Sequence, residues 1–415
     1  MGGVNVYIST VSMDAIAGRR VVVTGQQVGL FLGPLYTLHK AWTAIALARS
    51  LDAVPVFWLQ TEDHDWPEID HTAIPGDGPP VLRLAQPDPE ARISVSERRC
   101  GPDIERLHAE LESALGSLPY ADETLSLLRR HYVPEASVSA AFAGVLAEIF
   151  EAEGLVILDP RSPDFAPQTV AVHRRAITDA AAIAEALSAA GPGQVPIRPG
   201  APLSFFHPDG PDGPRYRLHP EGDGYRLAGR DLTISAEALL AALDAEPRCF
   251  STSALLRPLL QDTALDTVAY VGGPGEGRYY AQLAPLYAHF GRPAPRFEAR
   301  GRYRWITPRT ARALKRAGLT PDDCSGDRDT LIRRMAGSEA SGLEARVQDH
   351  LAAAISELKD AGADLDPGTL KTIDKAADSS AKTLSKAVSR ITRALGQRDE
   401  VRVAAMDTAL LALSP

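Results

Sequence analysis

Cysteine is scarce in this 415-residue sequence, which contains only Cys100, Cys249 and Cys324. The three are far apart and form no CxxC pair. This argues against a disulfide framework and against a cysteine-rich zinc site. Scattered, unpaired cysteines are typical of proteins in a reducing cytoplasm. We therefore expect a cytoplasmic protein.

An excess of positive charge and long apolar runs are also lacking. Lysine and arginine number 44 against 53 acidic residues, a net charge of −9. This balance argues against broad nucleic-acid binding, which needs a basic surface. No uninterrupted apolar run is long enough to span a bilayer, and the first twenty residues lack the pattern of a secretory signal. We expect no nucleic-acid or membrane partner.

A strand–loop–helix–strand pattern opens the informative part of the chain. A β-branched run at 21–24 precedes a helical pattern over 34–50 and a second apolar run at 54–59. This order is that of a βαβ unit and predicts an α/β fold with a Rossmann-like parallel-sheet core. Ligands of such sheets bind beyond the carboxyl ends of the strands. The loops 25–33 and 60–70 are therefore the predicted site.

Changes in composition predict how the remaining chain is organised. The last region has apolar residues at three- and four-residue steps over more than three heptads, which predicts a coiled-coil arm used for homodimer contact. The predicted regions are 1–74, the first part of the core; 75–135, a connective insertion; 136–190, the core continued, with one helix at about 166–189; 191–250, a small β-rich insertion; 251–337, the core completed; and 338–415, the C-terminal coiled-coil arm.

The segment Glu62-Asp63-His64-Asp65 carries the strongest chemical signal. Three acids flank a histidine directly after an apolar strand. A histidine beside carboxylates can act as an acid or base near neutral pH, so we predict these four residues to be catalytic. Two alternatives remain. The histidine could bind a metal together with the acids or His71, or the segment could be a solvated acidic turn. We predict no metal.

The loop after the first strand is rich in glycine and glutamine. It matches neither GxGxxG nor the P-loop pattern. Its backbone N–H groups could cradle an anion at the start of a helix, or its glycines could serve only strand–helix packing. The predicted binding residues here are Gly25, Gln26, Gln27 and Gly29.

Five further candidates lie on predicted helices. Tyr36 and Lys40 share a face, since they are four residues apart. Lys40 could hold a phosphate or carboxylate, or be an ordinary solvated lysine. Arg257, Gln261 and Asp262 lie on one face of a later helix. Arg257 could clamp a carboxylate or simply pair with Asp262.

A second glycine-rich turn follows the predicted strand at 267–271. It contains Gly272, Gly273 and Glu276 and opens a helix that carries Tyr279. Its N–H groups could bind an anion, and Glu276 could bind an ammonium or a ribose. The alternative is a plain turn with an acid favoured by the helix dipole.

Four segments together resemble the signature blocks of the BshC family, the cysteine ligases of bacillithiol biosynthesis. They are VVTGQQVGLFLGPLYTLHKAWTAIALA, PVFWLQTEDHDWPEIDHT, STSALLRPLLQDT and YVGGPGEGRYYAQLAPLYAHFGRPAPR. The resemblance covers about residues 20–400. It implies a Rossmann-like core related to class I nucleotidyltransferases, with inserted connective segments and a dimerising coiled coil. The implied reaction is the addition of L-cysteine to glucosaminyl-malate by amide formation.

ATP or another nucleotide is expected from the resemblance alone. No HxGH motif is present, and the KMSKS-like stretch at 382–386 falls inside the heptad pattern. Our working hypothesis places an anionic substrate group against Gly25–Gly29, Lys40 and Arg257. The acids around His64 would hold an ammonium, and His64 would accept the proton of the attacking amine. The alternatives are a related ligase with another amine substrate and a non-catalytic coiled-coil scaffold.

Both ends differ from the usual family pattern. Members usually have helical sequence before the glutamine loop and continue beyond the point that corresponds to Ser414-Pro415. The chain is therefore expected to be a compact form or to lack its ends.

Overall fold

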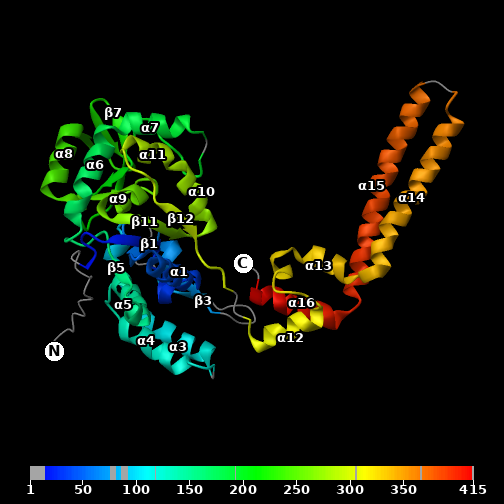
Figure 1. Ribbon diagram of the computed structural model, residues 1–415, viewed down its shortest axis with the longest axis horizontal. Coiled ribbons are helices and arrows are strands. Elements are labelled where there is room, and N and C mark those ends of the chain that lie inside the picture. The colour runs from blue at the N-terminus through cyan, green and yellow to red at the C-terminus, as the bar shows by residue number, and fades with distance from the viewer. Residues whose placement is uncertain are drawn as a thin grey trace. The chain divides into compact units, whose positions relative to one another are not determined.

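A computed structural model describes residues 15–74, 81–85, 92–116, 118–191, 193–303, 306–364 and 367–413. The chain forms two compact units, the first containing the described residues up to 303 and the second those from 306 onward (Figure 1). Along the described ranges, no helix combines the length and apolar character that crossing a membrane requires.

A five-stranded parallel sheet forms the centre of the first unit. Its order is β12-β11-β1-β2-β5, and every neighbouring pair is parallel. The predicted Rossmann-like sheet is confirmed, as are the strands expected at 21–24, 54–59 and 267–271. The relation to class I nucleotidyltransferases stays an expectation. The strands are β1 (Arg20–Gln26), β2 (Val54–Leu59), β5 (Val156–Leu158), β11 (Asp266–Gly272) and β12 (Arg296–Ala299).

The strand order places a crevice beside β1. From β1 the chain proceeds to β2 and β5 on one side, and it later returns to β11 and β12 on the other side. The loops that follow β1 and β11 therefore leave the sheet in opposite directions. A ligand crevice forms at such a switch point, at the carboxyl ends of the strands.

Helices cover both faces of this sheet because its strands bury side chains on both. Val22 packs with Ala44 and Ala48 of one helix, whereas Val21 and Val23 face the opposite core. The covering helices are α1 (Tyr36–Leu51), α5 (Val138–Phe150), α6 (Val170–Thr178), α7 (Ala180–Ala189), α9 (Leu256–Ala264), α10 (Pro274–Gln282) and α11 (Ala284–His289). Helices α3 (Ile104–Leu115) and α4 (Ala121–His131) pack on each other, and α4 packs on α5. Short elements α2 (Trp66–Ile69), β3 (His71–Ala73) and β4 (Val81–Arg83) precede α3.

Two helix predictions are corrected. The helix expected from residue 34 starts at Tyr36, because Phe31, Leu32 and Gly33 all have positive φ and turn the chain first. The single helix expected at 166–189 breaks at Asp179, whose side chain bonds Thr178, Arg175 and His289. Such local side-chain bonds compete with continued helix.

The first unit also contains a five-stranded antiparallel sheet of order β10-β6-β7-β8-β9. Its inner face packs on α8 (Ala236–Ala245) and α6 through Leu218, Leu227, Leu239 and Leu243. Its strands are β6 (Ser204–Phe206), β7 (Tyr216–Glu221), β8 (Gly224–Leu227), β9 (Thr233–Ser235) and β10 (Phe250–Thr252). Strand β10 leads directly into α9, which connects the two sheets.

The second unit is helical. Three helices, α12 (Pro308–Ala317), α13 (Arg328–Met335) and α16 (Glu400–Leu413), enclose a small core. Two long helices, α14 (Gly337–Ala361) and α15 (Pro367–Gln397), lie side by side as a hairpin (Figure 1). Leu358, Leu384 and Ile391 of the predicted apolar stripe are 56%, 38% and 50% exposed. The dimer contact stays a prediction.

Candidate functional site

A cavity of about 650 Å³ lies in the first unit, at the carboxyl ends of the parallel strands. Its walls come from the loops after β1, β2, β11 and β12, from the start of α9 and from the antiparallel sheet. The predicted site residues that line it are Gln26, Gln27, Tyr36, Lys40, Glu62, Asp63, His64, Arg257, Gly273, Glu276 and Tyr279. The topology therefore brings together segments that are more than two hundred residues apart.

Asp63 and His64 form an acid–base pair at the cavity wall. The Nδ1 atom of His64 lies 3.3 Å from Oδ1 of Asp63, and the same oxygen accepts the His64 backbone N–H at 2.7 Å. Gln27 donates to the other carboxylate oxygen at 3.3 Å. Burial favours a raised pKa for Asp63, but the bonds from His64 and the Arg215 charge hold it well below the usual value. Asp63 is therefore ionised and can orient the imidazole.

Two separate segments hold the loop that carries this pair. Ser94 donates to the Glu62 carbonyl at 3.1 Å, and the Val95 N–H donates to the Asp63 carbonyl at 2.7 Å. Arg215, from the antiparallel sheet side, donates to the Glu62 carbonyl at 2.5 Å and to the Thr252 carbonyl at 2.9 Å. The position of the loop thus depends on both sheets.

The Glu62 side chain also helps to hold this loop in place. One carboxylate oxygen accepts the Thr252 N–H at 3.0 Å, and the other accepts the Thr252 hydroxyl. Glu62 is only 9% exposed. Its carboxylate therefore connects the end of β10 to the loop after β2, which favours a positioning role over the predicted contact with an ammonium.

Lys40 and Glu276 form a buried ion pair between α1 and α10. The Lys40 ammonium contacts Glu276 at 2.6 Å, the Gly25 carbonyl at 2.8 Å and Gln26 Oε1 at 2.9 Å. A lysine has three N–H donors, so all are used. Burial lowers the pKa of Lys40 and the charge of Glu276 opposes that shift. The predicted anion contact by Lys40 would require the loss of one of these bonds.

Glu276 is equally engaged. It also accepts the Tyr270 hydroxyl at 2.7 Å and the Gly273 N–H at 2.8 Å. Burial favours a raised pKa for Glu276, but Lys40 and the Gly273 N–H hold it below the usual value. The ammonium that Glu276 contacts belongs to Lys40, and the predicted contact with an ammonium or ribose of a ligand stays a prediction.

The predicted cradle of N–H groups over Gly25–Gly29 is not formed. Gly25 lies within β1, where an added Cβ would stand 2.8 Å from the Trp58 carbonyl oxygen of the neighbouring strand. The Gly29 N–H already donates to the Gln27 carbonyl at 2.9 Å. Helix α1 starts only at Tyr36. These glycines are needed for close packing, which was the alternative interpretation.

Arg257 presents a buried guanidinium to the cavity. It is 7% exposed and donates to Gln261 at 3.2 Å and to the Tyr279 hydroxyl at 2.5 Å. Its guanidinium carbon also lies 5.7 Å from the Tyr270 ring centroid. The expected ion pair with Asp262 is not formed. Within the described ranges Arg257 forms no ion pair, so its charge remains available to an anion.

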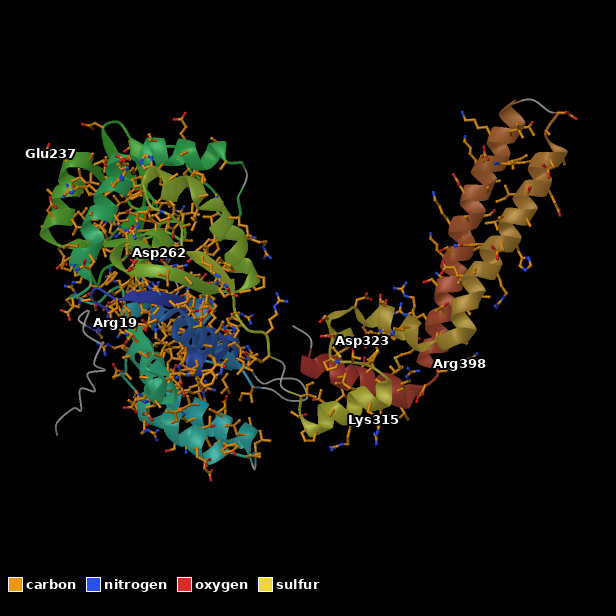
Figure 2. The ribbon with its side chains drawn as sticks, viewed as in Figure 1. Arg19, Glu237, Asp262, Lys315, Asp323 and Arg398 are labelled. Atoms are coloured by element: carbon orange, nitrogen blue, oxygen red, sulfur yellow. The ribbon has the colours of Figure 1, made fainter. Side chains whose placement is uncertain are left out.

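Gln261 and Asp262 lie behind Arg257 and do not line the cavity. Gln261 donates to Asp262, which also accepts the Tyr287 hydroxyl. Burial raises the pKa of Asp262 to about 6. Asp262 lies among the packed side chains of the first unit, whereas Arg19 and Glu237 lie at its margin (Figure 2). Gln261 and Asp262 therefore hold α9 in the packed interior of the first unit.

The remaining predicted residues lie at or outside the margin. Asp65 is exposed and precedes α2, away from the cavity. Gly272 ends β11, where an added Cβ would stand 2.8 Å from the Phe297 ring. His71 bonds Asp70 at 2.9 Å. Over the residues that the structure describes, no cluster of three or more His, Cys, Asp or Glu side chains could hold a metal.

Four arginines that line the cavity were missed. They are Arg198, Arg215, Arg217 and Arg300. Arg300 stacks 5.0 Å above the Tyr36 ring, and Arg215 is only 3% exposed. The spacing of Arg215 and Arg217, two residues apart on a strand, shows that they share a face. Nothing local indicates that this face meets the loop of His64.

Comparisons with known proteins agree with this geometry. The family model described as the bacillithiol biosynthesis BshC N-terminal Rossmann-like domain matches residues 12–301. Relatives named "Putative cysteine ligase BshC" occur in Koribacter versatilis, 33% identical over 96% of this chain and 76% of the relative, and in Heliobacterium modesticaldum, 34% identical over 82% and 62%. A third, in Chloroherpeton thalassium, is 28% identical over 93% and 73%.

Proposed function

The chain belongs to the BshC family of bacillithiol biosynthesis, and from this premise we propose that it joins L-cysteine to glucosaminyl-malate through an amide bond. The observation that carries the proposal is the placement of the Asp63–His64 pair in one cavity with Arg198, Arg217, Arg257 and Arg300, which form no ion pair among the residues that the structure describes. An amine nucleophile needs a base, and acidic substrates need cations. This cavity offers both.

The proposed reaction forms a C–N bond between the cysteine carboxyl carbon, activated beforehand as an acyl phosphate ester by a nucleotide, and the amine nitrogen of the sugar. The C–O bond to the phosphate group would break, and that phosphate group would leave with the bonding electron pair. The attacking amine must lose a proton as the C–N bond forms. Nδ1 of His64 lies 3.3 Å from the ionised Asp63 carboxylate but forms no hydrogen bond with it. We assign the other ring nitrogen, Nε2, as the acceptor of that proton. Asp63 would stabilise the resulting imidazolium, as a carboxylate does beside a catalytic histidine.

The anionic groups would lie on the opposite side of the cavity. Arg257 and Arg300 both line it, and both raise the local positive potential, since each lowers the pKa of Lys40. A nucleotide would supply the free energy for amide formation by activating a carboxylate. The guanidinium of Arg257, which forms no ion pair with any residue that the structure describes, fits a phosphate or carboxylate group. Arg257 and Arg300 are the residues that would hold it.

A thiol profile tests this proposal. Cells from which the gene for this chain is deleted should lose bacillithiol and accumulate glucosaminyl-malate. Reintroduction of the wild-type chain should restore both levels. Normal bacillithiol in the deletion strain would rule the proposal out. Loss of a different amide, with bacillithiol unchanged, would indicate a related ligase with another amine substrate.

A further inference from the structure

Two arginines on the antiparallel-sheet side of the cavity have no acid to balance them. Arg217 belongs to β7 and is partly buried, and Arg198 lies on the exposed segment that leads toward β6. Both line the cavity. Within the described part of the chain, neither forms an ion pair, although Arg215 and Arg226 nearby do. Neither residue belongs to the working hypothesis drawn from the sequence.

The two guanidiniums influence each other. Burial lowers the pKa of Arg217, and the neighbouring charge of Arg198 lowers it further. The same two arginines, with Arg226, oppose protonation of His219, whose pKa burial already lowers. Arg226 is paired with Glu221, 3.3 Å away. Arg198 and Arg217 have no such ion pair among the described residues. An anion bound between them would therefore relieve their mutual repulsion.

Phe205 places this pair beside the catalytic loop. It lies opposite Arg217 in the β6–β7 ladder, and the Arg217 guanidinium carbon is 5.2 Å from its ring centroid. Arg215 stacks on the same ring at 3.9 Å and reaches Asp63 at 3.4 Å. Arg217 and Asp63 are thus connected through one aromatic ring and one guanidinium.

We propose that Arg198 and Arg217 form a subsite for a dicarboxylate, which in this cavity is the malyl end of the amine substrate. The inference rests on the proposed function. Two guanidiniums match two carboxylates, each able to form paired N–H···O bonds, whereas a single carboxylate leaves one cation unmatched. Recognition of the malyl end here directs the glucosamine amine toward His64.

Isothermal titration calorimetry on the full chain tests the subsite apart from catalysis. The two ligands are glucosaminyl-malate and methyl glucosaminide, which carries the same amine but no carboxylate. Arg217→Met and Arg198→Met should each weaken glucosaminyl-malate binding by on the order of tenfold. Both should leave methyl glucosaminide binding unchanged. Arg217→Lys should retain part of the affinity, because it keeps the charge and loses the planar fork.

Arg226→Met is the matched control. It removes one positive charge from the next strand of the same sheet, outside the cavity lining, and should bind glucosaminyl-malate like the wild type. Equal loss in Arg226→Met and Arg217→Met, or no loss in either Arg198→Met or Arg217→Met, would overturn the subsite. Thermal unfolding of each variant checks that it is folded.

L-Malate alone separates the two proposals. If the wild type binds L-malate and Arg217→Met does not, the dicarboxylate subsite stands even where glucosaminyl-malate fails to bind, and only the proposed function is lost. If the wild type binds glucosaminyl-malate and the arginine variants bind it equally well, the function survives and the subsite falls.

Discussion

The two sides of the cavity hold charge in different ways. On the parallel-sheet side, the Lys40 ammonium has three oxygen partners, one of them the Glu276 carboxylate. On the antiparallel-sheet side, Arg198 and Arg217 face the cavity without an ion pair among the described residues. Charges that are satisfied within the protein fix the shape of a site. Charges that are not satisfied there are the ones free to bind a ligand.

Arg257 combines properties of the two sides. It belongs to the parallel-sheet side, but its hydrogen-bond partners, Gln261 and Tyr279, are neutral. Its orientation is fixed as firmly as that of Lys40, while its charge is not neutralised. A preorganised cation of this kind can bind an anion without a further entropic cost for ordering the side chain.

Breaking the Lys40–Glu276 pair should give the largest effect. Lys40→Met leaves the Glu276 carboxylate without its ammonium in a site where Lys40 is 4% and Glu276 18% exposed. We expect the free energy of unfolding to fall by about 3–5 kcal/mol, as for other buried pairs that lose one partner. Urea denaturation measures it.

The matched control for Lys40 is a surface pair. Arg106 and Glu110 of α3 are 56% and 46% exposed, so Arg106→Met should cost no more than about 0.5 kcal/mol. The double variant Lys40→Met/Glu276→Gln should be more stable than Lys40→Met alone. A loss below about 1 kcal/mol in Lys40→Met would show that this side is not built around the pair.

His207 should produce a smaller effect that depends on pH. It is fully buried behind the antiparallel sheet, where Ser251 bonds its Nε2, and burial lowers its pKa to about 3. The unfolded chain binds this proton at a higher pH than the folded chain does. Stability is therefore lost as the pH falls below about 6.5, by roughly 2 kcal/mol at pH 5.

His207→Gln provides the comparison, since the amide can bond Gly213 and Ser251 without titrating. Urea unfolding at pH 7 and pH 5 should show a smaller acid-induced loss in the variant than in the wild type. The readout is this difference, because His173 shifts in the same direction in both proteins. An identical loss would show that His207 is not held neutral.

Removal of the Arg257 charge should mainly affect ligand binding. We expect Arg257→Met to raise the KM for the activating nucleotide by about tenfold, the effect of one charged hydrogen-bonding group. The KM of Arg257→Lys should lie between those of the wild type and Arg257→Met, because lysine keeps the charge but not the bonds to both Gln261 and Tyr279. If the change appears in stability alone, Arg257 belongs with Lys40 as a structural cation.

The parallel sheet and its loops could be predicted because their signals are local. The apolar runs of β1 and β2 and the loop that contains His64 lie within one βαβ unit, and the sequence order specifies which strand ends carry polar residues. The sequence also identified Arg257 and Glu276 as candidates. It could not show that Glu276 meets Lys40, because that contact joins segments 236 residues apart in a geometry set by the whole sheet.

The antiparallel side could not be predicted for a related reason. Arg217 lies on the short strand β7 and Arg215 directly precedes it, in a local pattern that resembles any exposed hairpin. Their role depends on Phe205 and on the return of β10 to Glu62, which only tertiary structure determines. For the glycines of the first loop, a local signal was present but indicated a different role. Their local pattern suggested an anion cradle, whereas Gly25 is explained by its distance to Trp58.

The most direct test measures the bacillithiol content of cells whose only copy of the chain carries His64→Ala. Protein abundance should be verified by immunoblot, and a wild-type copy in the same strain gives the reference. We predict that bacillithiol is lost and glucosaminyl-malate accumulates, because His64 supplies the imidazole beside Asp63 that we propose as the proton acceptor. Wild-type bacillithiol in cells that carry only the His64→Ala chain would contradict the account.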